Sequence, residues 1–156
     1  MSAVETLRDW APHVTVAAVA AREDRFLLVE EIAGERCVLN QPAGHLEDHE
    51  ALVDAVIREV REETAWTFRP EYIVGVYRWR STRNAKTHLR VTFCGSVTEH
   101  LPGQPLDDGI LDATWLSYAQ IKQRKAQHRS PLVMRCIDDY LAGRRYGLDL
   151  LRDVLS

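Results

Sequence analysis

The feature that most limits the possible folds of this chain is a change in its hydrophobic period near residue 50. Upstream, residues 13–20 are apolar and β-branched, residues 25–31 return as a second strand, and residues 36–39 suit a short third one. Residues 50–64 instead place apolar side chains at spacings of three and four, which indicates one amphipathic helix. The sequence therefore predicts three strands followed by a helix.

The second half of the chain returns to strands and ends in helices. Residues 71–79 and 87–97 predict two further strands joined by a polar segment, and residues 113–116 predict a short one. Two helices follow, at about residues 118–125 and 131–142. Mixed strands with one inserted helix and two terminal helices are typical of a layered α/β domain with a mixed sheet (α+β).

Capping residues indicate where the helices begin and end. Asp48 is placed to cap the first helix, because its carboxylate can accept from the free N–H groups there. Ser130 and Pro131 suit the cap and the first position of the last helix, and Gly143 suits its end.

Composition and charge narrow the functional classes. The 156 residues are 46% hydrophobic and 28% charged, with a net charge of −3, which suits one globular domain over residues 1–156. Without a basic excess, nucleic-acid binding is not expected. The N-terminal residues do not predict a signal peptide, and no run approaches the ~18 apolar residues that span a bilayer. Three cysteines do not suggest a disulfide framework. We expect a cytoplasmic monomer or homodimer with no membrane partner.

Three glutamates on the first helix are the strongest chemical signal. At about 100° per residue, Glu62 lies about −60° and Glu63 about +40° from Glu59, so the three carboxylates share one face. Their repulsion requires a positive partner, and their hard oxygens suit Mg²⁺, with Mn²⁺ as the alternative. Arg58 can reach Glu62 one turn further on. Taken alone, however, the segment is more typical of a solvated acidic face that Arg58 and Arg61 neutralise.

The residues around this segment favour a metal site over a solvated acidic face. The chain contains the pattern G-x5-E-x7-R-E-U-x-E-E, where U is a bulky apolar residue, and this pattern resembles the box of the Nudix hydrolase family. Ala65 stands at the motif's second glycine, where a positive φ would cost alanine roughly 1 kcal/mol. Weaker similarity to bacterial phosphatases of this family extends from about residue 13 to residue 150. The six matching residues are Gly44, Glu50, Arg58, Glu59, Glu62 and Glu63.

The resemblance implies a Nudix α/β/α sandwich and Mg²⁺-dependent hydrolysis of a phosphoanhydride bond. It also implies that Glu59 and Glu63 are direct metal ligands, with Glu62 as a third ligand or as a base acting on water. The Gly44 carbonyl is a further candidate ligand, because glycine permits close backbone approach. Together with Arg58, the three glutamates form the predicted catalytic set.

Substrate binding requires cations near this helix. Lys86 and Arg90 are the preferred phosphate contacts by resemblance, and Arg78 on the preceding strand is a third candidate. Asn40 and Gln41 lead into the glycine loop and could hydrogen-bond a base or ring. For each cation, an ordinary solvated charge on a strand is the alternative.

Two loop segments have both a structural and a functional interpretation. Asp107, Asp108 and Asp112 could supply an extra metal ligand or base, although a turn-forming role is favoured for each. Residues 129–131 suit a helix cap better than a substrate contact.

The expected partner is a small phosphorylated metabolite. The resemblance implies a phosphatase that releases orthophosphate from nucleoside tri- and diphosphates and from the pyrimidine diphosphate precursor of thiamine. A diphosphatase acting on ADP-ribose, nucleotide sugars or dinucleotides is the alternative. A non-catalytic ligand-binding module is a third possibility, against which the intact set of Glu59, Glu62 and Glu63 argues.

Overall fold

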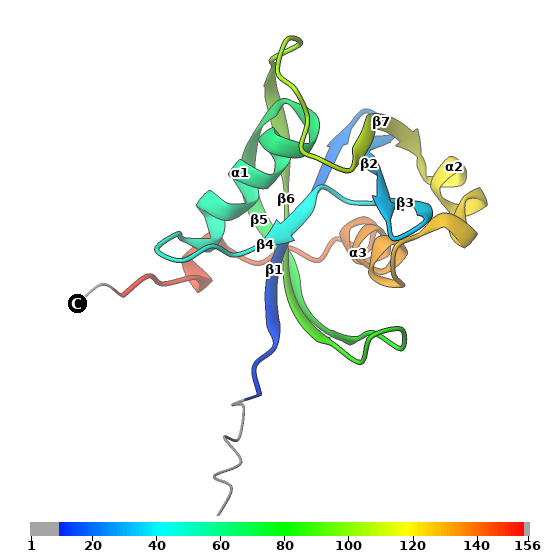
Figure 1. The fold of residues 1–156 in the computed structure, drawn as a ribbon. Helices are drawn as coiled ribbons and strands as arrows, with labels where there is room; N and C mark the ends of the chain where they lie inside the picture. Colours follow the sequence, from blue (N-terminus) through cyan, green and yellow to red (C-terminus); the bar gives the residue numbers. More distant parts are fainter. Residues whose placement is uncertain (1–9, 155–156) are drawn as a thin grey trace, which may run out of the picture.

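Seven strands, three α-helices and two short 3-10 helices make up the fold in the computed structural model, which describes residues 10–154 (Figure 1). The N-terminal residues 1–9, for which no signal peptide is predicted, lie outside this range. Within it, no helix has the length and apolar character that a bilayer crossing requires. The strands are β1 (His13–Arg22), β2 (Arg25–Ala33), β3 (Arg36–Asn40), β4 (Ala43–His45), β5 (Trp66–Arg80), β6 (Thr87–His100) and β7 (Ile110–Ser117). The helices are α1 (Leu52–Thr64), α2 (Tyr118–Gln123), η1 (Lys125–Gln127), α3 (Leu132–Leu141) and η2 (Leu148–Leu150).

The strands form one mixed sheet with β1 near its centre. Their order is β3-β2-β1-β6-β5, while β4 pairs with β1 and β7 pairs with β2. β1 and β6 run parallel, from His13 opposite His88 to Ala20 opposite Gly95, and the other pairs are antiparallel. This pairing brings β4, which carries the glycine of the motif, and β6 to the two sides of β1. The predicted mixed-sheet α/β fold is confirmed.

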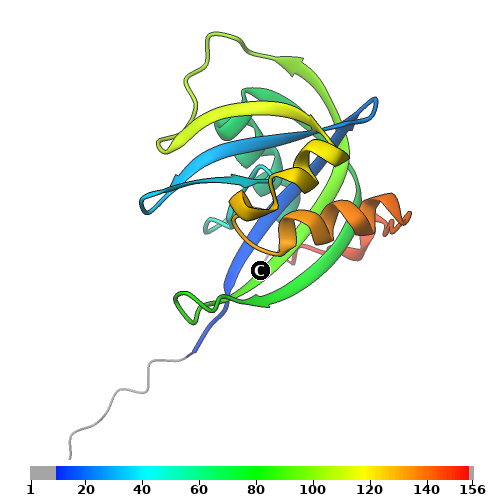
Figure 2. The ribbon, with the colours of Figure 1, turned by 90° about the vertical axis from the view of Figure 1, so that its right-hand side faces the viewer.

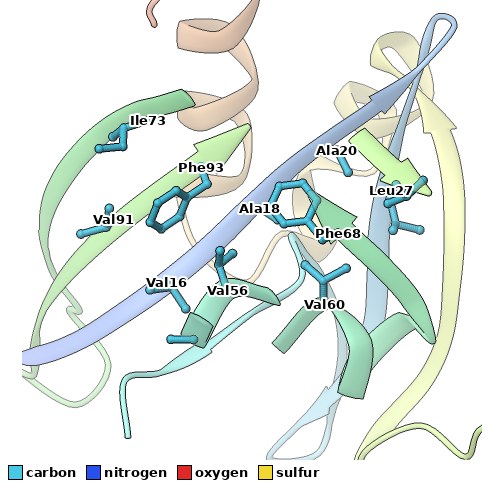
Figure 3. Packing of buried hydrophobic residues seen from close by; sticks show 12 residues of the cluster. Val16, Ala18, Ala20, Leu27, Val56, Val60, Phe68, Ile73, Val91 and Phe93 are labelled. Atoms are coloured by element: carbon cyan, nitrogen blue, oxygen red, sulfur yellow. The ribbon is translucent and has the colours of Figure 1, made fainter. Parts of the chain in front are cut away.

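Helices cover both faces of the sheet, with α1 on one side and α3 on the other (Figures 1 and 2). Successive residues of a strand point to opposite faces, so Val16 and Ala18 of β1 pack against Val56 of α1 (Figure 3), while Val19 belongs to the cluster that contains Ile137 of α3. Both faces of β1 are buried from Val16 to Ala20, and this part of the strand is a continuous apolar run. The predicted α/β/α sandwich is the observed architecture.

The observed strands differ from the predicted ones mainly in length. β5 begins at Trp66 rather than at residue 71, and shifts in its pairing with β6 allow the strand to include Pro70. The short strand β4 lies within the predicted loop 40–49, where Gly44 pairs with Val16. Three-residue strands carry too little periodicity to be recognised from sequence.

The two ends of α1 test the capping predictions. The assignment of Asp48 as the N-cap is wrong, because α1 begins at Leu52 and Ala51 occupies the cap position without a side-chain hydrogen bond. The carboxylate of Asp48 instead accepts a hydrogen bond from the His49 N–H. At the other end, Ala65 has a φ of 60° and closes the helix, so a residue with a side chain adopts the left-handed conformation that the motif assigns to glycine.

The last helix begins one residue later than predicted. Pro131 takes the cap position of α3 instead of its first position, and the Ser130 hydroxyl accepts from the Leu132 N–H at 3.2 Å. Gly143 follows the end of the helix with a φ of 84°, as the sequence predicts.

Candidate active site

β4 lies against the acidic face of α1 and shapes the site. Glu59 and Glu63 are buried, with only 8% and 6% of their surface exposed. The Ala43 N–H donates to Glu63 Oε1 at 2.7 Å. A Cβ at Gly44 would collide with the carboxylate of Glu59, so a side chain here would displace that carboxylate. The glycine of the motif therefore makes room for a carboxylate group.

Arg58 is the organising cation of this face. Its Nη1 donates to Glu59 Oε1 at 2.8 Å and to Glu62 Oε2 at 3.2 Å, so the predicted contact with Glu62 is confirmed. Its Nε and Nη2 donate to the two oxygens of Glu50 at 2.8 Å, and Nη2 also reaches the His45 carbonyl at 3.1 Å. A single guanidinium thus holds the loop before α1 against two carboxylates of the helix.

The electrostatic environment of the glutamates is unfavourable for their charged forms. Burial raises the pKa of Glu59, despite the opposing hydrogen bond from Arg58. Burial, followed by repulsion from Asp107, raises the pKa of Glu62. Burial also raises the pKa of Glu63 to about 9, and the charges of Glu31 and Glu59 contribute in the same direction. Such a concentration of buried carboxylates is stabilised by a bound cation.

Three carboxylates converge closely enough to hold a metal ion. Glu59, Glu62 and Asp107 each offer an oxygen, and these atoms lie within 4.8 Å of one another. The Asp107 N–H also donates to the Glu62 carbonyl at 2.9 Å, which fixes the loop before β7 beside α1. Three hard oxygen ligands beside the space at Gly44 suit Mg²⁺ or Mn²⁺.

The carboxylates of this set differ from the predicted ones in two residues. Asp107, for which a turn-forming role is favoured by the sequence, accepts from the Ile110 N–H in a turn and also joins the carboxylate cluster. Glu63 lies outside the cluster and accepts the Ala43 N–H instead. Sequence alone gives no reason to choose Asp107, because its distance to α1 depends on the path of the loop between β6 and β7.

A large pocket opens on the other side of β4. Its volume is about 1130 Å³, and Ala43, Gly44 and His45 form part of its wall. The hairpin between β5 and β6 and the start of α3 enclose it from two further sides. The charged side chains that line it are Glu31, Arg83, Arg90, Lys125, Arg129, Arg135 and Asp138, so cations predominate.

The structure brings together three of the five predicted substrate residues. Asn40 and Arg90 line the pocket, and Gln41 lies buried beside them, where its Oε1 accepts from Arg90 Nη1 at 3.2 Å. Arg78 and Lys86 are exposed and do not line the pocket. In β5, the residue after Arg78 contributes to the lining, so strand alternation directs Arg78 to the opposite face.

Several lining residues are not evident from the sequence. The rings of Trp79 and His88 stack at 5.4 Å, because the two residues are opposite each other in the β5–β6 pair. Arg129, for which the sequence favours a helix-cap segment, lies at the pocket with its Nη1 2.7 Å from Glu31 Oε1. A prediction of which residues pair across the β5–β6 hairpin could have placed Trp79 beside His88.

Comparison with known proteins agrees with this arrangement. Residues 11–136 match the family model described as NUDIX domain. The chain belongs to the Nudix family. Phosphatase NudJ of Escherichia coli strain K12 is 39% identical over 142 residues, which cover 91% of this chain and 92% of that protein.

Solved structures of Nudix proteins resemble the whole fold. The NUDIX hydrolase from Nitrosomonas europaea is 50% identical with a TM-score of 0.91, over 92% of this chain and 98% of that one. A MutT NUDIX hydrolase from Burkholderia pseudomallei is 17% identical with a TM-score of 0.71, over 83% of this chain and 98% of that one, and it shares the fold. The chain is therefore a Nudix phosphohydrolase, a class that acts on small phosphorylated substrates and typically uses a divalent metal.

Proposed function

We propose that this Nudix hydrolase is a Mg²⁺-dependent phosphatase that releases orthophosphate from nucleoside tri- and diphosphates and from the pyrimidine diphosphate precursor of thiamine. The observation that carries the proposal is the position of the carboxylate cluster of Glu59, Glu62 and Asp107 near a pocket whose charged side chains are mostly cations. Such a site can bind the oxygens of a polyphosphate from two sides. Similarity to phosphatase NudJ over most of the chain supports the choice of substrates.

The carboxylate cluster is the place for the metal. Glu59, Glu62 and Asp107 would hold Mg²⁺ or Mn²⁺, with Glu63 and the Gly44 carbonyl as the additional ligands that the family resemblance implies. Bound there, the cation would neutralise phosphate oxygens and lower the pKa of a water molecule. Arg58 keeps Glu59 and Glu62 oriented through its two contacts at 2.8 and 3.2 Å.

The reaction is a displacement at the terminal phosphorus. The oxygen of water forms a bond to that phosphorus, the bond to the bridging oxygen breaks, and the shortened phosphate ester leaves with the electron pair. Glu62 is the most exposed of the three glutamates on the acidic face of α1, so if it acts as a base instead of a third ligand, it is best placed to take the proton of the water. On the pocket side, Arg90 and Asn40 would bind the substrate, and Lys86 at the nearby hairpin would add positive charge. The predicted substrate contact of Gln41 is not made directly, because its buried amide holds Arg90 at 3.2 Å from below the pocket surface.

The alternative substrates have a second organic group beyond the cleaved bond. A pocket of about 1130 Å³ with the Trp79–His88 stack along one side has room for such a group. A diphosphatase acting on ADP-ribose, nucleotide sugars or dinucleotides is therefore the second candidate.

Product analysis separates the two candidates. GTP, CTP, ATP, the pyrimidine diphosphate and ADP-ribose are each incubated with the protein and Mg²⁺, and products are followed by phosphorus NMR, with EDTA as the control. Orthophosphate as the first product from each triphosphate, with rates within about tenfold of one another, is the expected result. First products of pyrophosphate and monophosphate would refute the phosphatase, and hydrolysis of ADP-ribose alone would favour the diphosphatase. The cytoplasmic location and the monomer or homodimer stay predictions.

A further inference from the structure

The buried guanidinium of Arg90 has no carboxylate partner. Its residue is only 7% exposed, although it lines the pocket. Its terminal nitrogens donate to neutral groups, namely Gln41 Oε1 at 3.2 Å, Asn40 Oδ1 at 3.4 Å and Cys136 Sγ at 4.0 Å. Among residues 10–154, no acidic side chain lies within ion-pair distance of it. A buried charge without a counter-ion is costly, so the site favours an anionic ligand.

A chain of hydrogen bonds connects Arg90 to a second arginine across the pocket. Asn40 accepts from Arg90 through Oδ1 and donates through Nδ2 to Glu31 Oε1 at 3.5 Å. The same Glu31 oxygen accepts from Arg129 Nη1 at 2.7 Å, and the Arg129 backbone N–H is anchored to the Leu39 carbonyl at 3.0 Å. The network thus contains two guanidinium groups but one carboxylate, which contacts Arg129 alone, so its net charge is positive.

The position of this network relative to the carboxylate cluster is fixed by the sheet. Thr15 of β1 is opposite Arg90 of β6 on one side and opposite His45 of β4 on the other. Gly44, next to His45, borders the carboxylate of Glu59. The cationic network and the carboxylate cluster therefore lie on the two sides of β4.

From these contacts we propose that Arg90 and Arg129, linked through Asn40 and Glu31, form a phosphate-binding site that works without the metal. The site would hold a phosphate group of the substrate beside the one attacked at the carboxylate cluster. This inference rests on the proposed function for its substrate, but the binding itself is independent of hydrolysis. Arg129 would be a substrate-binding residue, and Glu31 a positioning residue that holds it over the pocket.

Titration of the metal-free protein with inorganic diphosphate tests the site. In EDTA, calorimetry should detect diphosphate binding to the wild-type protein, and Arg90→Gln should weaken it at least about tenfold, the effect of losing one charge-assisted hydrogen bond. Arg129→Gln should also weaken binding. Glu31→Gln should strengthen it, because the glutamine oxygen can still accept from Arg129 and hold it in place while the negative charge beside the anion is removed. If Arg129 and Glu31 only stabilised the fold, both substitutions would weaken diphosphate binding, so changes in affinity of opposite sign indicate direct contact with the anion.

Controls make the outcome decisive. Arg69 is exposed at the other end of β5, where its side chain hydrogen-bonds to Ser96, so Arg69→Gln should leave diphosphate binding unchanged. Malonate serves as the carboxylate probe and should bind more weakly than diphosphate. Unchanged binding in a folded Arg90→Gln variant, no binding by the wild-type protein, or tighter binding of malonate would each overturn the proposal. If Arg90→Gln does not fold, the other two variants test the site. Weaker diphosphate binding by Arg129→Gln together with tighter binding by Glu31→Gln would support it, and any other pair of results would overturn it.

Failure of this site and failure of the proposed function give different results. If the protein binds diphosphate in EDTA but releases no orthophosphate from the substrate panel with Mg²⁺, the phosphatase is wrong and the phosphate site stands. If hydrolysis occurs while the arginine variants bind diphosphate as the wild type does, the site is wrong and the phosphatase stands. If the phosphate site and the phosphatase activity are both confirmed, Arg129→Gln should raise KM more than it lowers kcat.

Discussion

Replacement of Arg58 by alanine should destabilise the fold well beyond the loss of a surface ion pair. The Arg58 side chain is 22% exposed, and its main partners, Glu50 and Glu59, are 15% and 10% exposed. An exposed pair contributes only about 0.2–1 kcal/mol, while breaking a buried one costs about 3–5 kcal/mol. The ion pairs of Arg58 are neither fully exposed nor fully buried, and its guanidinium donates to several acceptors at once. We therefore expect the free energy of unfolding to fall by about 2–4 kcal/mol at pH 7.

The size of this loss should depend on pH in a defined direction. The hydrogen bond from Arg58 lowers the pKa of Glu50, so the stability that this pair provides is present above the ordinary pKa of 4.5 and is lost as pH falls through the lower value in the folded protein. The difference between wild type and Arg58→Ala should therefore shrink below about pH 4.5. Urea unfolding in EDTA, followed by circular dichroism at pH 7 and at pH 4, measures both quantities.

A neighbouring arginine provides the matched control for this experiment. Arg61 is exposed on the same helix, and its side chain makes no hydrogen bond or ion pair to the residues that the structure describes, so Arg61→Ala should cost less than about 0.5 kcal/mol. If Arg58→Ala costs no more than Arg61→Ala at pH 7, the central role of Arg58 in this face is refuted.

Two further predictions concern the other unusual residues of α1. Burial raises the pKa of Glu63 to about 9 from an ordinary 4.5, so the metal-free protein should lose stability as pH rises through this interval, and Glu63→Gln should be more stable than wild type by at least about 2 kcal/mol at pH 9 but not at pH 4. Urea unfolding in EDTA measures the free energy of unfolding of both proteins across this pH range. A difference between them that does not change with pH would contradict the prediction. Ala65 holds a φ of 60°, so Ala65→Gly should stabilise the protein by about 0.5–1 kcal/mol, and a lower melting temperature would show that its buried methyl group matters more.

Local sequence patterns predict the elements that carry the chemistry. The helical period of α1 and the positions of its glutamates indicate an acidic face, and Glu59 and Glu63 are indeed buried on it. The glycine position of the motif anticipates a left-handed residue at the helix end, and Ala65 adopts that conformation. These features depend on residues within a few turns of one another, and so the sequence contains them directly.

Contacts between distant segments explain what the sequence does not reveal. Asp107 joins the carboxylate cluster only because the loop before β7 returns to Glu62, and Arg129 reaches the pocket only because residue 39 of β3 binds its backbone. Strand alternation and pairing place Arg78 and Arg90 on opposite faces of the sheet, and Arg90 is the inward one because α3 covers its face. Sequence alternation shows that two faces exist but not which one is inward.

Binding of Mn²⁺ to the carboxylate cluster tests the central claim most directly. Electron paramagnetic resonance titration of the wild-type protein, Glu59→Gln and Asp107→Asn gives metal affinity, and orthophosphate release from GTP gives kcat for the same samples. We predict that the wild type binds Mn²⁺, that both variants bind it more weakly, and that Glu59→Gln, a nearly isosteric change, lowers kcat at least ~10²-fold. A folded Glu59→Gln variant with wild-type Mn²⁺ affinity and wild-type kcat would contradict the assignment of the metal to this face of α1.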